Sequence, residues 1–201
     1  MYISFFKRIF DFLVAFILFL LFMPLFLLLA LLVKLDSKGP VFFRQQRGGK
    51  GGHYFNILKF RSMTVKEKSD GKDFDAGGSV RITRMGKILR KSKLDELPQL
   101  INVIRGEMSL VGPRPEVRTY IELYPERWNK VLSVTPGITD PASVVFRDEE
   151  TILSKAEDPE KEYRENILPT KLNLYEKYVD EISFFGDLKV LFKTVLVVIF
   201  G

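Results

Sequence analysis

A long apolar run near the N-terminus constrains this chain more than any other feature. Residues 12–33 are apolar without interruption and carry no charge. As a helix the run would contain about 22 residues and measure roughly 33 Å, enough to cross the hydrocarbon core of a bilayer. It is too long for the core of a signal peptide, and no small-residue cleavage site follows it at Lys34. We therefore predict a retained membrane segment; the buried helix of a soluble domain is the alternative.

Pro24 lies in the middle of this run. A proline leaves the carbonyl of Leu20 without its helical partner and clashes with that turn, which costs about 3 kcal/mol and favours a kink. The apolar side chains favour insertion by several kcal/mol more, at about 0.3 to 0.6 kcal/mol each. The sequence therefore predicts a membrane helix that is bent at Pro24.

Basic residues flank both ends of the run. Positive flanks favour the cytoplasmic side of a membrane, so both ends are expected there. A straight span would satisfy only one flank, whereas a helix that enters, bends and returns to the same face satisfies both. We therefore predict a re-entrant helix, with a straight span as the alternative. The flanking cations are Lys7 and Arg8 before the run and Lys34, Lys38, Arg44, Arg47 and Lys50 after it.

The composition excludes several kinds of catalysis. The chain contains no cysteine and a single histidine, His53. Thiol catalysis is therefore excluded, and a Ser-His-Asp triad or a multi-histidine zinc site is disfavoured. Any reaction must depend on carboxylates, Lys and Arg, hydroxyls, backbone groups or a hard metal ion. The net charge of +6 indicates a phosphate-rich partner, which leaves nucleic acid, anionic lipid or a nucleotide open.

A second informative stretch, residues 92–116, carries two adjacent acids, Asp95 and Glu96, near its start. Pro98 suits the first turn of a helix, where a backbone donor has no partner anyway. We therefore expect a helix that begins at Asp95 and ends at Gly106. Its predicted core face consists of Leu97, Leu100, Ile101 and Ile104.

The acid pair has two interpretations. In the first, Asp95 is the helix N-cap and Glu96 a first-turn acid, each stabilising the helix by about 0.3 to 1 kcal/mol. In the second, the two carboxylates belong to a reactive site. The second is favoured by the density of positive charge around them, which suggests a third, anionic party. The cations are Arg81, Arg84, Lys87, Arg90, Lys91, Lys93, Arg105, Arg114 and Arg118.

Two extended segments, residues 40–44 and 54–63, are expected on either side of a glycine-rich turn at residues 48–52. Lys59 and Arg61 are two residues apart in the second segment and therefore share one face of a strand. Both could point at one anion. The alternative is a solvated edge on which the two cations extend into water.

Local signals also indicate the elements that follow. Residues 66–80 are polar and rich in Gly and Asp, which predicts a loop. Thr83 is the expected cap of a short basic helix. One amphipathic helix is predicted over residues 120–134, and Pro136 and Gly137 are expected to end it in a turn.

Two segments near the C-terminus have alternative interpretations. The acidic run at residues 148–165 favours a solvated helical face over a metal site. Residues 184–200 form an apolar segment that also contains Asp187, Lys189 and Lys193. Its charge-free part is too short to span a bilayer, so it suits a helix in the membrane interface or one docked on the core.

Several motifs together resemble those of the bacterial sugar transferase family, the monotopic phosphoglycosyl transferases. The resemblance extends from the membrane segment to about Thr139, and its central motif is highly specific. The chain looks like the minimal members, which have only the catalytic core. The motifs are Gly39-Pro-Val-Phe-Phe, Lys59-Phe-Arg-Ser-Met, Arg84-Met-Gly, Leu94-Asp-Glu-Leu-Pro-Gln-Leu, Asn102-Val, Met108-Ser-Leu-Val-Gly-Pro-Arg-Pro-Glu and Pro136-Gly-Ile-Thr.

The resemblance implies an α+β monotopic membrane protein of the bacterial inner membrane, active on its cytoplasmic face. Residues 1–38 would be the re-entrant membrane helix, and residues 39–201 a small mixed catalytic domain with a C-terminal interfacial helix. Such enzymes transfer a sugar phosphate from a UDP-sugar to undecaprenyl phosphate, release UMP and start a glycoconjugate. The implied roles are nucleophile for Asp95, magnesium ligand for Glu96 and nucleotide or phosphate binding for Arg114.

The chemistry of these residues agrees with that assignment. A carboxylate with an ordinary pKa of about 3.9 is ionised at neutral pH and can attack phosphorus without a general base. Mg²⁺ typically takes one or two protein carboxylates together with substrate phosphates. Pro113 and Pro115 restrict the backbone on both sides of Arg114, which favours a bidentate contact with phosphate. The other predicted ligands are Lys59, Arg61 and Arg90 for the UDP-sugar and Lys7 and Arg8 for the polyprenyl phosphate.

The chain departs from the common family pattern after Pro136-Gly-Ile-Thr. Many members continue with Gly, a variable residue, Ala and Gln, whereas this chain has Asp140, Pro141, Ala142 and Ser143. The sugar, the pathway and the oligomeric state, including a homodimer, are left open. The main rival is a non-catalytic basic protein that binds anionic lipid or scaffolds partners. Binding of nucleic acid is disfavoured because the apolar N-terminus confines the chain to a membrane.

Overall fold

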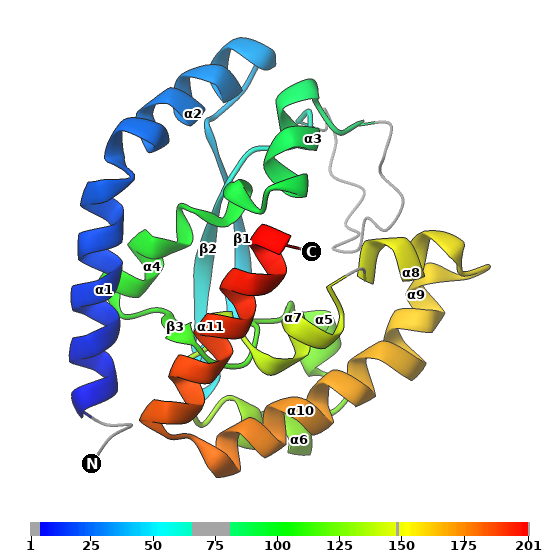
Figure 1. The fold of residues 1–201 in the computed structure, drawn as a ribbon. Coiled ribbons are helices and arrows are strands. Elements are labelled where there is room, and N and C mark those ends of the chain that lie inside the picture. The colour runs from blue at the N-terminus through cyan, green and yellow to red at the C-terminus, as the bar shows by residue number, and fades with distance from the viewer. Residues whose placement is uncertain (1–4, 66–80, 148, 201) are drawn as a thin grey trace.

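The apolar run forms two helices that meet at a sharp bend. In the computed structural model, which describes residues 5–65, 81–147 and 149–200, α1 (Lys7–Leu21) and α2 (Met23–Asp36) are bent by 65° at Phe22 (Figure 1). Pro24 occupies the first turn of α2, where its missing N–H has no helical partner to lose. The predicted bend is therefore confirmed. Within the described ranges no single helix is long and apolar enough to cross a membrane, but the bent pair meets the length and composition criteria as a unit.

The side chains of α1 are arranged with polar groups inward and apolar groups outward. Lys7, Asp11 and Ala15 are its buried residues and follow each other at intervals of one helical turn. This arrangement is the reverse of the one expected for a surface helix in water. The exposed apolar residues of α1 are Ile9, Phe12, Leu13, Phe16, Ile17, Leu20 and Leu21.

An antiparallel hairpin follows the bent pair. Strand β1 (Phe42–Gly48) pairs with β2 (Tyr54–Phe60), and Lys59 lies opposite Phe43. A short helical turn, η2 (Lys50–Gly52), connects the strands, and Gly51 and Gly52 adopt φ values of 69° and 78° that suit glycine. The prediction of two extended segments around a glycine-rich turn is confirmed.

The helix predicted to begin at Asp95 is shorter and starts later. A 3₁₀ turn, η4 (Leu94–Glu96), carries the acids, and α4 (Gln99–Arg105) begins only after Pro98. The prediction was wrong because Lys93 adopts a left-handed conformation with φ of 57°, and the tight turn that follows it ends before Pro98. Gly106, with φ of 86°, ends α4 as predicted. The predicted core face also packs against buried clusters.

A second, parallel sheet was not expected from the sequence. Strand β3 (Ser109–Val111) pairs with β4 (Gly137–Thr139), so the predicted turn at Pro136 and Gly137 is instead the start of a strand. Each strand has three residues, too few for a pattern of alternation. Gly112 and Gly137 allow the two backbones to approach closely, because a Cβ on Gly137 would lie 2.1 Å from the nitrogen of Gly112.

The remaining helices confirm one of the local predictions and contradict another. Thr83 caps α3 (Arg84–Lys91) as expected, with its side chain accepting a hydrogen bond from the N–H of Gly86. The single helix predicted over residues 120–134 is two helices, because Pro125 begins the second one. The predicted loop at residues 66–80 lies outside the described residues. The later helices are α5 (Arg118–Ile121), α6 (Pro125–Val131), α7 (Pro141–Val145), α8 (Glu149–Lys155), α9 (Pro159–Glu162), the π-helix η5 (Tyr163–Ile167), α10 (Leu168–Glu181) and α11 (Phe184–Phe200).

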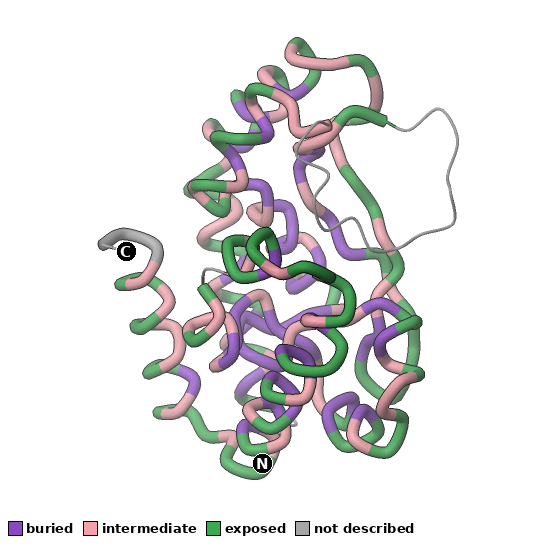
Figure 2. The backbone as a smooth tube through the Cα atoms, turned by 90° about the vertical axis from the view of Figure 1, so that its right-hand side faces the viewer, coloured by how far each residue is buried: buried purple, intermediate pink, exposed green. Residues whose placement is uncertain are grey.

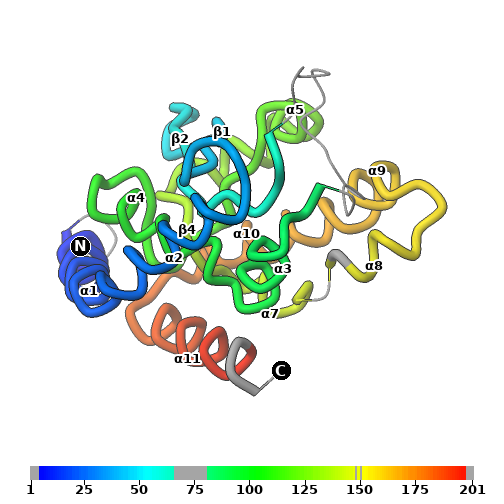
Figure 3. Tube along the Cα trace, turned by 90° about the horizontal axis from the view of Figure 1, so that it is seen from above, coloured from blue at the N-terminus to red at the C-terminus, as the bar shows by residue number. Residues whose placement is uncertain are grey.

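Buried clusters hold these elements around the two sheets. One joins α1, β2, α4 and β3; another joins α2, β2 and α3; a third lies between α6, η5 and α10 and contains Trp128 and Leu172. Seen from above, α8 and α9 lie on the side of the molecule opposite α1 (Figure 3). Elements from both ends of the chain thus meet at the hairpin and the parallel sheet.

The C-terminal helix α11 has a docked side and an exposed side. Asp187 is buried, and the hydroxyls of Thr194 and Thr139 lie 2.6 Å apart, which ties α11 to β4. On the other side Phe185 and Phe192 are 80% and 66% exposed, and Figure 2 shows exposed residues alternating with half-buried ones along the helix. Docking of residues 184–200 on the core is therefore confirmed, and a place for the exposed side in the membrane interface stays a prediction.

The acidic run is helical and mostly exposed. Exposed acids in it include Glu157, Glu160 and Glu165, which agrees with the predicted solvated face. Glu149 is an exception, because it forms an ion pair with the buried Lys171 of α10.

Candidate active site

The two acids at the centre of the site are not helix caps. The N-cap positions of η4 and α4 are occupied by Lys93 and Pro98, and neither helix has a side-chain cap. The interpretation of Asp95 as an N-cap is therefore wrong. Asp95 is only 8% exposed, and a carboxylate is rarely buried without a partner or a function.

Glu96 binds two cations that come from separate parts of the chain. The Nζ of Lys59, on β2, lies 2.7 Å from the Oε1 of Glu96. The guanidinium of Arg114, in the loop after β3, donates from Nη2 to the same oxygen and from Nη1 to Oε2 at 3.4 Å. Such a fork fixes the guanidinium in orientation as well as distance. The structure thus brings together the three predicted residues Lys59, Glu96 and Arg114.

Asp95 and Glu96 have opposite electrostatic environments. Burial raises the pKa of Asp95, and the neighbouring Glu96 raises it further, while Lys59 opposes the shift. Burial would also raise the pKa of Glu96, but Arg114 and Lys59 outweigh it and hold that pKa far below its usual range. Within the described part of the chain, no hydrogen bond or ion pair joins the Asp95 side chain to another residue. One acid is therefore neutralised by partners, and its neighbour is left without them.

The pKa values of the two cations, Lys59 and Arg114, are shifted in opposite directions. Burial lowers the pKa of Lys59, although Glu96 counteracts this. Glu96 raises the pKa of Arg114 well above its usual value and thereby exceeds the opposing effect of burial. Glu96 therefore favours the charged form of both cations, and for Lys59 it offsets part of the effect of burial.

The loop that carries Arg114 is anchored on both sides. The carbonyl of Pro113 accepts a hydrogen bond of 2.9 Å from the N–H of Gly137 in β4. Both predicted prolines, Pro113 and Pro115, are buried. On the far side Glu116 accepts hydrogen bonds from Arg47 at 2.7 Å and from the hydroxyl of Tyr163 at 2.6 Å. The backbone of Arg114 is thus held between two fixed neighbours.

Arg61 and Arg90 are not brought into this group. Arg61 is 4% exposed, and its guanidinium donates to the carbonyls of Val33 at 3.0 Å, Ser37 at 2.6 Å and Pro40. It therefore secures the C-terminal end of α2 to the end of β2, where a cation complements the helix dipole. Arg90 is half-buried in the last turn of α3 and is not among the cations that act most strongly on Asp95 or Glu96.

Lys7 and Arg8 lie on α1, and both have partners within the protein. The Nζ of Lys7 is 2.6 Å from the Oδ2 of Asp187, and Arg8 donates to the carbonyls of Val103 and Ile104 at the end of α4. That they bind a lipid phosphate stays a prediction. In this arrangement a phosphate would compete with Asp187 and with two helix carbonyls.

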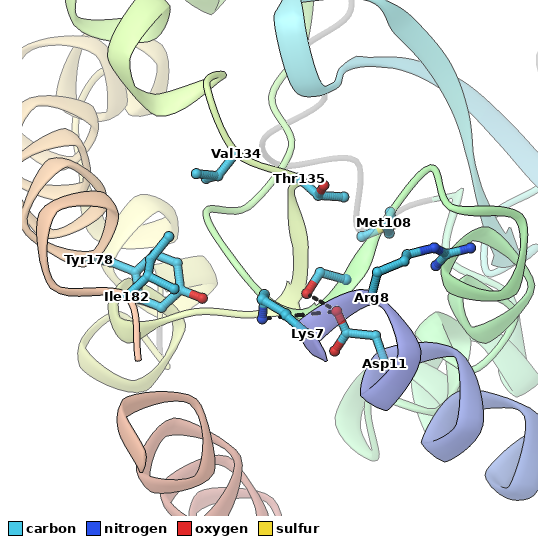
Figure 4. A pocket seen from close by; sticks show the side chains of 9 residues that line it. Lys7, Arg8, Asp11, Met108, Val134, Thr135, Tyr178 and Ile182 are labelled. Carbon is cyan, nitrogen blue, oxygen red and sulfur yellow. Dashed lines mark hydrogen bonds and ion pairs between the residues drawn. The ribbon is translucent and has the colours of Figure 1, made fainter. Parts of the chain in front are cut away.

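A small cavity of about 30 Å³ lies beside these cations (Figure 4). A space of this size suits about one or two water molecules rather than a lipid headgroup. Asp11 lines it and accepts a hydrogen bond of 2.6 Å from the hydroxyl of Ser109. The other lining residues are Lys7, Arg8, Met108, Val134, Thr135, Tyr178 and Ile182.

Two further charged residues act on this group, although the sequence did not predict either of them as a site residue: Lys93, named only among the cations around the acid pair, and Asp140. The positive charge of Lys93 opposes the rise in the pKa of Asp95, and the left-handed backbone of Lys93 lies just before η4. Asp140 is fully buried, and its negative charge contributes to raising the pKa of Arg114. The departure from the family pattern at residue 140 was the one signal that marked this position. Together, fold and site define a small α+β protein in which two largely buried carboxylates and two cations gather at one place, the kind of charge cluster that is common at functional sites.

Comparisons with known proteins identify the family. A model of the bacterial sugar transferase family matches residues 2–201. The chain is 38% identical over 203 residues to a UDP-N-acetylgalactosamine-undecaprenyl-phosphate N-acetylgalactosaminephosphotransferase of Aeromonas hydrophila. It is 40% identical over 196 residues to a UDP-glucose:undecaprenyl-phosphate glucose-1-phosphate transferase of Caulobacter vibrioides, and 37% identical over 193 residues to one of Escherichia coli. The chain belongs to the bacterial sugar transferase family, as its motifs predicted.

The matches cover this chain almost completely but cover the relatives unequally. The three alignments include 98%, 94% and 94% of this chain. They include 44%, 68% and 39% of the three relatives. The activity named for each relative therefore belongs to a protein that is longer than this chain.

Proposed function

We propose that this chain is a phosphoglycosyl transferase. It moves a sugar 1-phosphate from a UDP-sugar to a polyprenyl phosphate and releases UMP. The names of the relatives support undecaprenyl phosphate as the acceptor and a UDP-sugar as the donor. The observation that carries the proposal is the contrast between the acids: Asp95 is buried without a described partner, while Glu96 is bound by Lys59 and Arg114.

In the first step a carboxylate oxygen of Asp95 attacks the phosphorus that bears the sugar. A new O–P bond forms, and the bond between that phosphorus and the bridging oxygen breaks. The bridging oxygen leaves with the electron pair as part of UMP. The product is a phosphosugar joined to Asp95 as an acyl phosphate. The carboxylate needs no general base because it loses no proton.

In the second step an oxygen of the polyprenyl phosphate attacks the same phosphorus. The bond to Asp95 breaks, and the carboxylate is regenerated with its charge. One phosphoanhydride of the donor has then been exchanged for one in the product, so no further energy source is required. Because UMP leaves before the lipid phosphate reacts with the covalent intermediate, the two steps give ping-pong kinetics.

Arg114 and Lys59 bind the phosphates of the donor in this proposal. Each now contacts Glu96, so a phosphate that enters the site competes with a carboxylate for cations already held in place. Because the loop of Arg114 is anchored at Pro113 and Glu116, the guanidinium meets the phosphate with little reorganisation.

Magnesium is the proposed cofactor, and the donor atoms fit it. Glu96 offers a hard oxygen ligand, and Mg²⁺ usually binds one or two carboxylates with substrate phosphates completing the shell. The described residues contain no group of three or more His, Cys, Asp or Glu that would hold a metal by themselves. The charges of Asp95, Glu96, Lys59 and Arg114 cancel, so a diphosphate needs further neutralisation. The bound ion would stabilise negative charge on the departing phosphate.

The bent helix pair is proposed to enter the cytoplasmic leaflet and return to the same face. The support comes from the 65° bend and from α1, which buries Lys7 and Asp11 while its apolar residues face outward. The exposed side of α11, with Phe185, Phe192 and Lys189, is proposed to lie in the membrane interface beside it. The site would then meet its lipid acceptor at headgroup level.

Intact-protein mass spectrometry tests the chemistry directly. The detergent-solubilised protein is incubated with Mg²⁺ and a panel of UDP-sugars but without lipid acceptor, alongside Asp95→Asn. We expect a mass gain of one phosphosugar in the unmodified chain and none in the variant. UMP release that depends on lipid but leaves no adduct would refute the covalent step alone. Absence of both signals for every donor would favour a non-catalytic, lipid-binding protein.

A further inference from the structure

Asn102, on α4, has a completely buried side chain that forms hydrogen bonds to the backbone of β2. Its Oδ1 accepts a hydrogen bond of 3.0 Å from the N–H of Leu58, and its Nδ2 donates one of 2.8 Å to the carbonyl of Asn56. Strand β1 pairs with the other edge of β2. One amide side chain therefore provides the donor and the acceptor that a third strand would otherwise supply.

The orientation of this amide is fixed by a third contact. The Nδ2 also donates to the Oε2 of Glu107 at 2.7 Å, and the carbonyl of Asn102 accepts from the N–H groups of Glu107 and Met108. Both side-chain donors and the side-chain acceptor are thus used. These hydrogen bonds fix the position of α4 along β2, which hydrophobic packing alone would not do.

This contact lies at the junction between the two halves of the proposed site. Leu58 immediately precedes Lys59, and α4 follows directly on the turn that carries Asp95 and Glu96. The ion pair of 2.7 Å between Lys59 and Glu96 crosses the same junction. A shift of β2 along α4 would therefore change that distance directly.

We propose that Asn102 is a positioning residue that sets the register of β2 against α4 and so places Lys59 beside the acid pair. Its side-chain hydrogen bonds go to Leu58, Asn56 and Glu107 and not to Asp95 or Glu96, so it acts through Lys59. The inference rests on the proposed function for its kinetic consequence, but the placement of Lys59 is measurable without any activity. A displacement of about 1 Å at such a site lowers a rate by roughly 10²-fold.

The pattern of bonds specifies asparagine. Alanine would leave the N–H of Leu58 and the carbonyl of Asn56 buried without partners. Aspartate would keep an acceptor for Leu58, but it would lose the donor to Asn56 and set a second negative charge against Glu107.

A cycle of variants tests whether Asn102 acts through Lys59. The kinetic constants for lipid-dependent UMP release are measured for Asn102→Ala, Lys59→Ala and the double variant. We expect each single change to lower kcat/KM at least tenfold, and the double variant to lie within about twofold of Lys59→Ala. If the losses of kcat/KM in the two single variants multiply in the double variant, the proposal is overturned. The matched control is Val103→Ala, at the next residue of α4, which is also completely buried. Its fold-loss in kcat/KM should multiply with that of Lys59→Ala.

A second readout keeps the inference separate from the proposed function. The rate at which an amine reagent modifies Lys59 is followed by peptide mass spectrometry in the full chain. We expect Asn102→Ala to raise this rate severalfold, because Lys59 loses its contact with Glu96, and Val103→Ala to leave it unchanged. An unchanged rate in a folded Asn102→Ala protein refutes the inference even if no donor is ever turned over. If Asn102→Ala does not fold, Asn102→Asp replaces it, with the same expected direction.

Discussion

Replacing Glu96 with glutamine removes the charge that holds Lys59 and Arg114. The variant keeps the size of the side chain but leaves the two cations facing each other without a carboxylate between them. The side chains of Glu96, Lys59 and Arg114 are 16%, 22% and 31% exposed, so water screens the pair only in part. Breaking such a buried pair from one side typically costs about 3 to 5 kcal/mol, and partial exposure reduces this to about 2 to 4 kcal/mol at neutral pH.

The same ion pairs predict how the loss of stability in Glu96→Gln changes with pH. The pKa of Glu96 is lowered on folding, so its stabilisation is present above the unfolded value of 4.5 and is lost as the pH falls toward the folded value. At pH 3, about 1.5 units below the unfolded value, the contribution is smaller by about 2 kcal/mol. The stability difference between the unmodified chain and Glu96→Gln should therefore shrink by that amount between pH 7 and pH 3.

Trp128 provides the assay, because it is the single tryptophan of the chain and only 1% exposed. Urea unfolding in detergent is followed by its fluorescence at both pH values for the unmodified chain and for Glu96→Gln. The control is Glu122→Gln, which breaks an exposed ion pair with Arg118 and should cost less than about 1 kcal/mol at either pH. If Glu96→Gln lowered the free energy of unfolding by the same amount at pH 7 and at pH 3, the ion pairs would not contribute as argued.

Three further predictions concern Asp95, Arg61 and the bent helix pair of α1 and α2. Asp95→Asn should abolish turnover yet unfold at the same or a higher urea concentration at pH 7, since burial raises the pKa of Asp95 and its charge is therefore unfavourable in the folded state; a destabilised variant contradicts this. Arg61→Ala should increase hydrogen exchange at residues 33–40, because three carbonyls lose their donor, whereas the exposed Arg44→Ala should not. Cysteines at Phe5 and Lys38 should react with an impermeant reagent from the same side of sealed vesicles, and labelling from opposite sides would exclude re-entrance.

The features that could be predicted from the sequence depend on short-range physical rules. Pro24 bends the apolar N-terminal segment, Thr83 caps α3 and Gly106 ends α4 because each effect acts within one helical turn. The hairpin was predictable for the same reason, since its glycine-rich turn lies between two extended segments. The acid pair and the two cations that now meet at Glu96 were also predicted, but only as members of one site and without their contacts.

The features that could not be predicted depend on contacts between distant residues. Strands β3 and β4 are too short to have a periodicity and exist because the backbones meet at Gly112 and Gly137. Arg61 was expected at the substrate, because strand periodicity placed it on the same face as Lys59. It instead binds carbonyls at the end of α2, a contact between residues more than twenty positions apart. No local pattern distinguishes a cation that binds a ligand from one that closes a helix end.

The division of labour between Asp95 and Glu96 follows from the geometry that the sequence prediction missed. In an α-helix beginning at Asp95, both acids would lie in the first turn, where the helix dipole lowers the pKa of each. The 3₁₀ turn after the left-handed Lys93 instead directs Glu96 to Lys59 and Arg114 and leaves Asp95 buried without them. Two neighbouring carboxylates thereby acquire pKa values shifted in opposite directions. In the proposed reaction Asp95 is the nucleophile, and Glu96 beside it holds the two cations that would bind the donor phosphates.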